Sequence, residues 1–170
     1  MIGVKKELNK FRNIRLLAMD IDGVLTDGGV YILESGQEFR RFDIKDGLGI
    51  KQVMEKGIQV VWISAGVCEA ARHRANKLGV SEVHLGVSDK RQCLEKICSE
   101  KNIPMDRVAY IGDDLTDLDV IEQVGLPCAP INAIEKVRQA VCYVTQAQGG
   151  HSAVREICDL LLLSKADTIT

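Results

Sequence analysis

The sequence lacks several features that would assign it to common classes of protein. Its 170 residues carry a formal net charge of −2 and no dense cluster of lysine or arginine, so the charge pattern indicates neither nucleic acid nor an anionic membrane as a partner. No apolar run approaches the length of a membrane span, and residues 1–15 lack the continuous apolar segment of a signal peptide. These absences favour a cytoplasmic protein that acts on small molecules.

Cysteine is present, but without the spacing of a disulfide framework. The six cysteines form no C-x-x-C pair and the chain shows no sign of secretion, which predicts reduced and mostly buried thiols. Cys68 and Arg74 match the C-x5-R spacing of cysteine-based phosphatases, but that motif needs a loop whose backbone N–H groups face a phosphate. The residues between them lack glycine and favour a helix that ends at Gly79. The apolar face of this helix is predicted to hold Val67, Ala71, Ala75 and Leu78.

Apolar, β-branched segments alternate with stretches of helical periodicity along the chain. Strands are predicted at 14–20, 58–64, 82–86, 107–113, 125–131 and 142–145. Helices are predicted between them, for example over 46–57 and 89–102. This alternation favours a parallel sheet with helices on both faces, and no interdomain linker interrupts it. We therefore expect residues 1–170 to form a single α/β domain with a doubly wound, Rossmann-like parallel sheet.

One segment breaks the alternation directly after the first predicted strand. Residues 28–43, "GGVYILESGQEFRRFD", predict two short strands around the turn "ESGQ", which together form a β-hairpin. The hairpin is more apolar than a solvent-exposed one should be, which predicts an oligomer that covers it. The apolar residues in question are Val30, Tyr31, Ile32, Leu33, Phe39 and Phe42.

Polar side chains follow three of the predicted strands at the point where each ends. Asp20 and Asp22 follow the first, Ser64 follows the second, and Asp113 begins an acidic pair after "RVAYIG". Because the carboxyl ends of parallel strands meet at one edge of the sheet, ligands bind there. Lys90 opens the helix after "LGVSD", and a further acid lies one helical turn past Asp113.

Carboxylates gathered at one edge of the sheet repel each other, and a bound hard divalent cation commonly offsets this repulsion. Mg²⁺ takes a few carboxylate oxygens, keeps several waters and bridges to substrate phosphate. Ser64 and Lys90 could supply the hydroxyl and the positive charge that a phosphate needs, and Asp20 could attack phosphorus to form an aspartyl-phosphate. Asp22, two residues along, could give a proton to the leaving group and take one from water.

These residues resemble the four motifs of the haloacid dehalogenase superfamily of phosphotransferases. The match consists of "DIDGVLTDG", the serine after "VVWI", Lys90 and "GDDLTD", in the expected order over most of the chain. The resemblance implies that Asp20 is the nucleophile, that Asp22 is the general acid and base, and that Ser64 and Lys90 bind phosphate. It implies that Asp20, Asp22 (through its carbonyl) and Asp113 bind Mg²⁺, with Asp114 and Asp117 in support. Asp114 could alternatively cap only the following helix.

Superfamily members usually carry a cap domain, but here the first insertion is only a hairpin and residues 65–89 have room for one helix and one strand. This uncapped arrangement, with "DGLGI", "LGVSDK" and "QGGHSAVRE", is similar to the sugar-acid branch, above all the 3-deoxy-D-manno-octulosonate 8-phosphate phosphatases of lipopolysaccharide precursor synthesis. Members of that family are homotetramers whose hairpins form a central barrel, and their C-terminal segment helps to enclose the substrate. By this resemblance the candidate substrate-binding residues are Asp46, Arg74, Lys77, His151 and Arg155.

Two departures leave the substrate open. The family more often has arginine where His151 stands, and its serine motif typically continues to an arginine where this chain has Gly66. The related nonulosonate 9-phosphate phosphatases have glutamate there, with an arginine and a lysine that Arg74 and Lys77 would match. The alternatives are therefore a phosphatase for a nonulosonate 9-phosphate or another sugar phosphate and, in a different class, a regulatory module that keeps its phosphoaspartate. Asp22 argues against the regulator, because a hydrolytic base beside the nucleophile would shorten the life of that intermediate.

Overall fold

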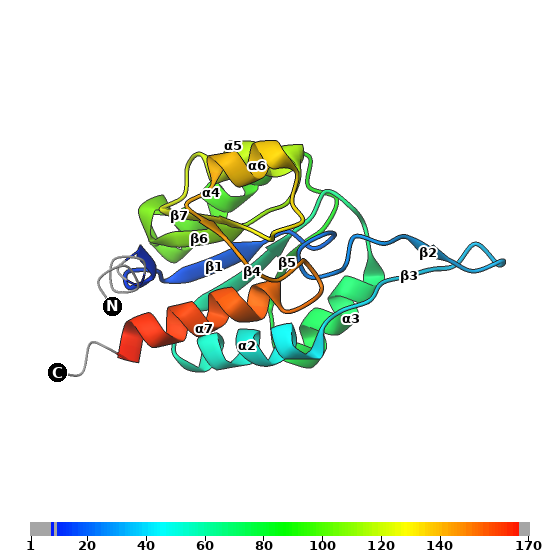
Figure 1. Cartoon of the computed structure of the whole chain (residues 1–170), viewed down its shortest axis with the longest axis horizontal. Coiled ribbons are helices and arrows are strands. Elements are labelled where there is room, and N and C mark those ends of the chain that lie inside the picture. The colour runs from blue at the N-terminus through cyan, green and yellow to red at the C-terminus, as the bar shows by residue number, and fades with distance from the viewer. Residues whose placement is uncertain (1–7, 9, 167–170) are drawn as a thin grey trace.

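A computed structural model describes residue 8 and residues 10–166 of the chain (Figure 1). Most of residues 1–15, where no signal peptide is expected, lies outside the described part. The strands are β1 (Leu16–Met19), β2 (Tyr31–Ile32), β3 (Glu38–Phe39), β4 (Gln59–Ile63), β5 (Glu82–His84), β6 (Val108–Ile111), β7 (Leu126–Ala129) and β8 (Tyr143–Val144). The α-helices are α2 (Ile44–Glu55), α3 (Glu69–Leu78), α4 (Lys90–Lys101), α5 (Leu118–Ile121), α6 (Glu135–Ala140) and α7 (Ala153–Ala166), with 3₁₀ turns η1 (Met105–Arg107) and η2 (Leu115–Asp117).

The main sheet has six strands, all parallel, in the order β5-β4-β1-β6-β7-β8. The order runs outward from β1 in both directions, which is the doubly wound arrangement, and each of the six predicted strands is confirmed. β1 lies near the middle, and its last residue, Met19, is level with Trp62 of β4 and Ile111 of β6. The three strands that precede the polar motifs therefore end side by side.

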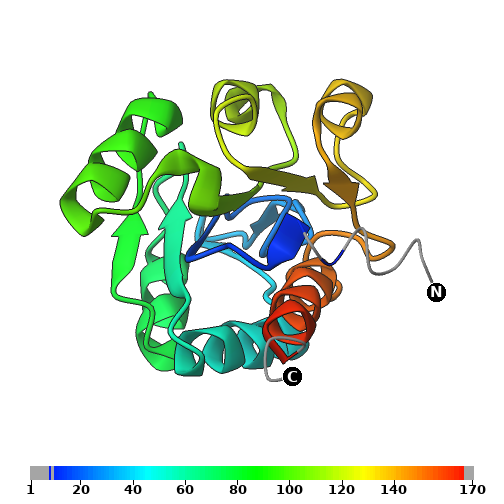
Figure 2. The ribbon, with the colours of Figure 1, turned by 90° about the vertical axis from the view of Figure 1, so that its left-hand side faces the viewer.

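Helices cover both faces of this sheet (Figure 2). Helices α2, α3 and α7 pack on one face, where the buried cluster includes Leu17, Met19 and Trp62. Helices α4, α5 and α6 cover the other, against a cluster that includes Leu16, Ala18 and Val61. Consecutive residues of β1 thus point into different cores, which explains why the strand is apolar throughout and not alternating. No helix of the described part is long and apolar enough to cross a membrane.

Helix α3 occupies the stretch with the C-x5-R spacing. Its backbone is helical from Glu69 to Leu78 and ends at Gly79, whose φ of 84° is the left-handed conformation that glycine adopts most easily. The backbone N–H groups between Cys68 and Arg74 therefore do not form a phosphate loop, and the prediction of a helix is confirmed. Val67 was wrongly placed on the buried face. It precedes the helix and is 76% exposed.

All six cysteines are free, as predicted, but only half of them are buried. Cys98, Cys128 and Cys158 lie in the cores, whereas Cys142 is exposed and the remaining two are partly covered. Burial raises the pKa of each of the three buried thiols. These thiols are accordingly packing residues and weak nucleophiles.

The predicted hairpin is confirmed as the antiparallel pair β2–β3, which projects from the body of the molecule (Figure 1). Tyr31 is paired with Phe39, and their rings stack with centroids 5.0 Å apart. Val30, Ile32, Leu33 and Phe39 are each between 46% and 65% exposed. Phe42, by contrast, stacks on Trp62 and belongs to the core beneath the hairpin.

Candidate active site

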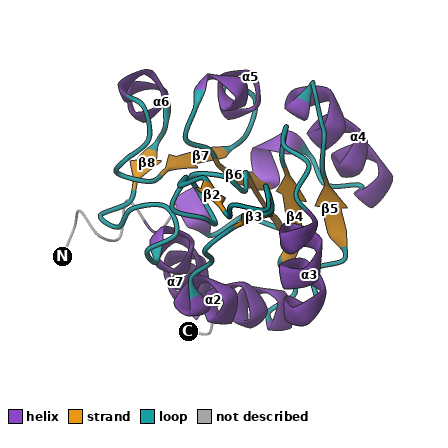
Figure 3. Ribbon diagram, turned by 90° about the vertical axis from the view of Figure 1, so that its right-hand side faces the viewer, coloured by secondary structure: helices purple, strands orange, loops and turns teal. Residues whose placement is uncertain are grey.

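The polar residues expected at the strand ends meet at the carboxyl edge of the sheet, where the loops gather in Figure 3. Asp20 follows β1, Ser64 follows β4 and Asp113 lies two residues after β6. Asp20 is 7% exposed and Ser64 is 4% exposed. Buried polar side chains of this kind are stable only when they find partners, so their contacts indicate how the site is built.

Lys90 is the cation at the bottom of this site. It is the first residue of α4, it is 4% exposed, and its Nζ lies 2.9 Å from Asp20 Oδ2 and 2.8 Å from Asp117 Oδ1. Burial opposes the charge on Lys90, but the carboxylates of Asp117 and Asp20 outweigh it and raise the pKa of the ammonium group. Lys90 therefore stays protonated and joins the loop after β1 to the loop after β6.

Asp117 is fully buried and already accepts four hydrogen bonds. Its Oδ1 accepts from Lys90 Nζ and, at 2.7 Å, from the hydroxyl of Tyr110 on β6. Its Oδ2 accepts from the backbone N–H groups of Asp113 at 3.0 Å and Asp114 at 3.3 Å. An oxygen of Asp117 lies close enough to Asp20 and Asp113 to share a metal ion, but these donors use its lone pairs. Asp117 thus holds the acidic loop in place, and the side chain of Asp114 caps η2 by accepting from Leu115 N.

The carboxylates of Asp20 and Asp113 fit a divalent cation. Oδ1 of Asp113 is buried and has no hydrogen-bond partner among the described residues. Burial and the negative charges of Asp20 and Asp117 raise the pKa of Asp113 to about 8. Burial and the charge of Asp117 also raise the pKa of Asp20 to about 6, although Lys90 acts in the opposite direction. A bound cation would neutralise both groups and use the unpaired oxygen.

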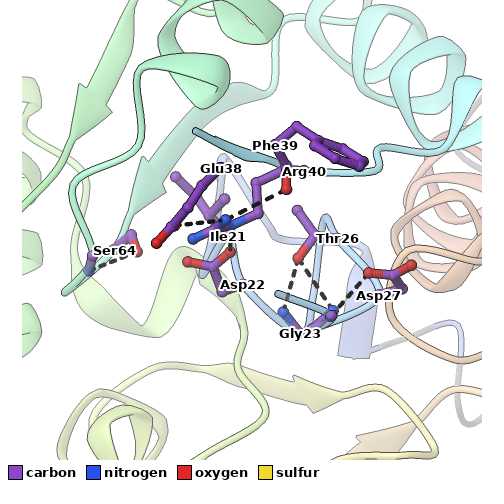
Figure 4. Close-up of polar contacts among 12 residues, drawn as sticks. Ile21, Asp22, Gly23, Thr26, Asp27, Glu38, Phe39, Arg40 and Ser64 are labelled. Atoms are coloured by element: carbon purple, nitrogen blue, oxygen red, sulfur yellow. Dashed lines mark hydrogen bonds and ion pairs between the residues drawn. The ribbon is translucent and has the colours of Figure 1, made fainter. Parts of the chain in front are cut away.

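Gly23 allows the side chain of Asp113 to contact the loop after β1, which carries Asp20 and Asp22. It has a φ of 84°, and a Cβ at this position would collide with Asp113 Oδ2. The next segment is fixed by Thr26, whose Oγ1 accepts from the backbone N–H groups of Gly23 and Gly28 (Figure 4). The small residues after Asp22 therefore bring two acidic loops into contact.

Asp22 and Ser64 are drawn with the hairpin residue Arg40 in Figure 4. The side chain of Asp22 is 38% exposed, and its Oδ1 accepts from Arg40 Nε of the hairpin at 2.9 Å. Ser64 Oγ accepts from the backbone N–H of Gly66 at 3.1 Å. Arg40 is not among the residues predicted for the site, because an arginine in a predicted hairpin carries no signal of its own.

The remaining candidates lie around the C-terminal segment and α3. Asp46 is 1% exposed, and its Oδ1 accepts from the backbone N–H of Arg155 at 2.7 Å, so it joins α2 to α7. Burial raises the pKa of Asp46 to about 6. Arg74 donates to the backbone carbonyl of Asp43 at 3.0 Å, and Lys77 is exposed on α3. Direct contacts between these residues and a substrate stay predictions.

Residues 149–151 pack against the loop after β1 and against the hairpin. A Cβ on Gly149 would collide with the carbonyl oxygen of Gly23, so the turn lies directly on the loop after β1. Arg41 of the hairpin donates to Gly150 O at 2.6 Å and lies 3.4 Å from His151 Nε2. The His151 ring is thus beside the hairpin, whereas the side chain of Arg155 is paired with Asp159.

Comparison with known proteins agrees with this geometry. Residues 75–157 match the family described as haloacid dehalogenase-like hydrolase. The chain is 39% identical to the 3-deoxy-D-manno-octulosonate 8-phosphate phosphatase of Yersinia pestis over 158 residues, which cover 93% of this chain and 84% of that protein. The crystal structure of the Y. pestis phosphatase superimposes with a TM-score of 0.91 over 94% of this chain and 86% of the other, at 38% identity.

A second crystal structure, of the same phosphatase from Moraxella catarrhalis, contains a magnesium ion, a phosphate ion and a KDO molecule. It has a TM-score of 0.93 and 34% identity to this chain, covering 96% of this chain and 94% of the other. The fold and site define a capless haloacid dehalogenase-like hydrolase. Within that class, the chain belongs to the 3-deoxy-D-manno-octulosonate 8-phosphate phosphatase family.

Proposed function

We propose that this protein is a Mg²⁺-dependent phosphatase that hydrolyses 3-deoxy-D-manno-octulosonate 8-phosphate to the free sugar acid and phosphate, in lipopolysaccharide precursor synthesis. The observation that carries the proposal is that the buried carboxylate of Asp20 and the partly buried carboxylate of Asp113 lie together, with the ammonium group of Lys90 beside Asp20. The relatives described above act on this substrate, and one holds magnesium, phosphate and KDO. A magnesium ion, held by Asp20, Asp113 and the main-chain carbonyl of Asp22, would supply positive charge to the phosphoryl oxygens.

In the first half-reaction, a carboxylate oxygen of Asp20 attacks phosphorus. The bond from phosphorus to the sugar oxygen breaks, and Asp22 gives its proton to that oxygen as the sugar acid leaves. Lys90 and the hydroxyl of Ser64 hold the phosphoryl oxygens. Asp22 suits this role because it is the more exposed acid, whereas Asp20 is fixed by Lys90 and by the backbone N–H of Ile21 at 2.7 Å.

In the second half-reaction, water attacks phosphorus and the bond to Asp20 breaks. Asp22 takes the proton from this water, which returns both carboxyl groups to their starting state and releases inorganic phosphate. Asp117 acts through other residues: it fixes Lys90 and the loop that carries Asp113. A regulatory module that retains its phosphoryl group would not need an acid at Asp22.

The decisive experiment measures phosphate release from 3-deoxy-D-manno-octulosonate 8-phosphate and from a nonulosonate 9-phosphate, each with Mg²⁺ and with EDTA. We expect turnover that needs Mg²⁺ and prefers the first substrate. Preference for the second would assign the chain to the nonulosonate enzymes, with Gly66 as the mark of changed specificity. A phosphoenzyme that persists for minutes, without release, would instead favour the regulatory module.

The assembly and the compartment are part of the same proposal. A homotetramer formed through the hairpin would bury the exposed apolar residues Val30, Ile32, Leu33 and Phe39. Six unpaired cysteines suit the reducing cytoplasm. Light scattering would test the first expectation and cell fractionation the second.

A further inference from the structure

Arg40 differs from its neighbours on the hairpin. The two residues beside it, Phe39 and Arg41, are exposed, whereas the side chain of Arg40 is only 13% exposed. It turns back from the hairpin toward the loop after β1 (Figure 4). Burial of an arginine carries a cost that its contacts must offset, so this inward orientation needs a reason.

The guanidinium group of Arg40 binds two carboxylates of the chain itself. Nε donates to Asp22 Oδ1 at 2.9 Å, and Nη1 donates to Glu38 Oε2 at 3.2 Å. The contacts of Arg40 with other described residues use Nε and Nη1, which leaves the hydrogens of Nη2 for another acceptor. Each edge of the guanidinium group pairs Nη2 with a nitrogen that is already in use, so the remaining donor is Nη2 alone, and a charged donor of this kind forms a stronger hydrogen bond to a carboxylate than a neutral donor does.

The contact with Asp22 places the guanidinium group of Arg40, and with it Nη2, on the leaving-group side of the proposed reaction. Asp22, which Arg40 contacts, gives its proton to the oxygen that joins phosphorus to the sugar. Gly66 lies at the same place, since an added Cβ would come within 3.3 Å of Asp22 Oδ2 and 3.6 Å of Ser64 Oγ. Lys90, by contrast, is shared between two buried carboxylates below the phosphate site.

We propose that Arg40 is a specificity-determining residue: Nη2 donates to the carboxylate of the sugar acid while Nε keeps Asp22 in place. Arg40, from the hairpin, then supplies the positive charge for the acidic substrate. Gly66, which stands where the family typically has an arginine, cannot supply that charge. The hairpin therefore takes part in the site as well as in assembly. This inference rests on the proposed function, because it requires a substrate with a carboxylate.

The test compares Arg40→Gln, Arg40→Lys and the control Arg107→Gln on 3-deoxy-D-manno-octulosonate 8-phosphate and on p-nitrophenyl phosphate, which has no carboxylate. Arg107 lies at the amino end of β6, away from the site. For Arg40→Gln, KM for the sugar-acid phosphate should rise about tenfold to a hundredfold more than KM for p-nitrophenyl phosphate. Arg40→Lys should recover part of this difference, and Arg107→Gln should match the wild type.

Two results would overturn the inference. An equal rise in KM for both substrates would mean that Arg40 binds phosphate, and a fall in kcat alone, equal for both, would mean that it only orients Asp22. Failure of the proposed function would look different, since the wild-type enzyme would then hydrolyse neither sugar-acid phosphate.

A second measurement uses only the wild-type enzyme and so does not depend on how the variants fold. Free 3-deoxy-D-manno-octulosonate should inhibit the hydrolysis of p-nitrophenyl phosphate, and its methyl ester, which lacks the charge, should inhibit at least about tenfold more weakly. Equal inhibition by the acid and the ester would rule out a charged contact to the carboxylate.

Discussion

The acidic site and the hairpin each hold side chains in an unfavourable environment: carboxylates away from water in the site, and apolar side chains in water on the hairpin. The two regions differ in which groups offset this cost. The site buries Asp20 and Asp117 and partly buries Asp113, and the chain itself supplies Lys90, Tyr110 and backbone N–H groups as partners. The hairpin exposes four large apolar side chains, and the described residues do not cover them. The acidic site is therefore largely assembled within one chain, whereas the exposed side chains of the hairpin would be covered only in the proposed assembly.

The largest expected effect is on the chemistry of the site. Asp20→Asn keeps the shape of the side chain but removes the proposed nucleophile, so the rate of phosphate release should fall by about a thousandfold or more. Circular dichroism should match the wild type, and Asp106→Asn, at an exposed residue on the far edge, should retain full activity. Activity of Asp20→Asn near the wild-type level would exclude the covalent mechanism.

Next in size is the loss of the buried cation. Lys90→Met leaves the carboxylates of Asp20 and Asp117 without their partner, which should lower the free energy of unfolding by about 3–5 kcal/mol. Urea denaturation without Mg²⁺ measures this change. Lys96→Met, on the same helix with a side chain 78% exposed, should change it by less than about 0.5 kcal/mol. Equal effects of the two substitutions would mean that the buried ion pairs add nothing to the fold.

A smaller effect concerns Asp46, which joins α2 to α7. Because burial raises its folded-state pKa from 3.8 to about 6, the folded chain binds this proton more tightly than the unfolded chain does. Its contribution to the free energy of unfolding therefore falls as pH rises from about 4 to about 6, by at most about 3 kcal/mol. Asp46→Asn should remove this part of the pH dependence in urea titrations. Parallel curves for variant and wild type would contradict the assignment.

The smallest effect on the fold itself should come from the hairpin. Ile32→Lys with Phe39→Lys should lower the unfolding free energy of the single chain by only about 1 kcal/mol, because Ile32 is 62% exposed and Phe39, 46% exposed, loses mainly its stacking on Tyr31. The mass in solution should nevertheless fall to that of one chain in light scattering, whereas Glu34→Lys at the turn should leave it unchanged. A full assembly in the double variant would remove the hairpin from the interface.

Much of this architecture could be predicted from the sequence, because its determinants are local. The apolar run that ends at Asp20 and the helical spacing of Leu94, Ile97 and Cys98 follow from periodicity, and the structure confirms the strand and the helix. Gly79 marks a helix end for the same local reason. The assignment of all 170 residues to one domain stays a prediction.

The contacts made by individual side chains could not be predicted in this way. The hydrogen bond from Tyr110 to Asp117, the burial of Asp46 and the pairing of Arg40 with Asp22 all depend on how separate segments meet. In the sequence, Tyr110 is indistinguishable from the apolar residues of its strand. Phe42 falls within the predicted hairpin, although in the structure it packs against the core. Periodicity identifies a buried face but not the partner of each side chain upon it.

The close fit of Gly149 against Gly23 has a consequence for how the molecule is made. The two glycines are far apart in the sequence, and the loop that carries the proposed nucleophile is completed only when the later segment lies against it. Contacts between distant segments form slowly, since a long stretch of chain must be ordered first. On the ribosome, the loop after β1 emerges early but must wait for the turn at residues 149–150. We expect the catalytic loop to be among the last parts of the protein to reach its final form during synthesis.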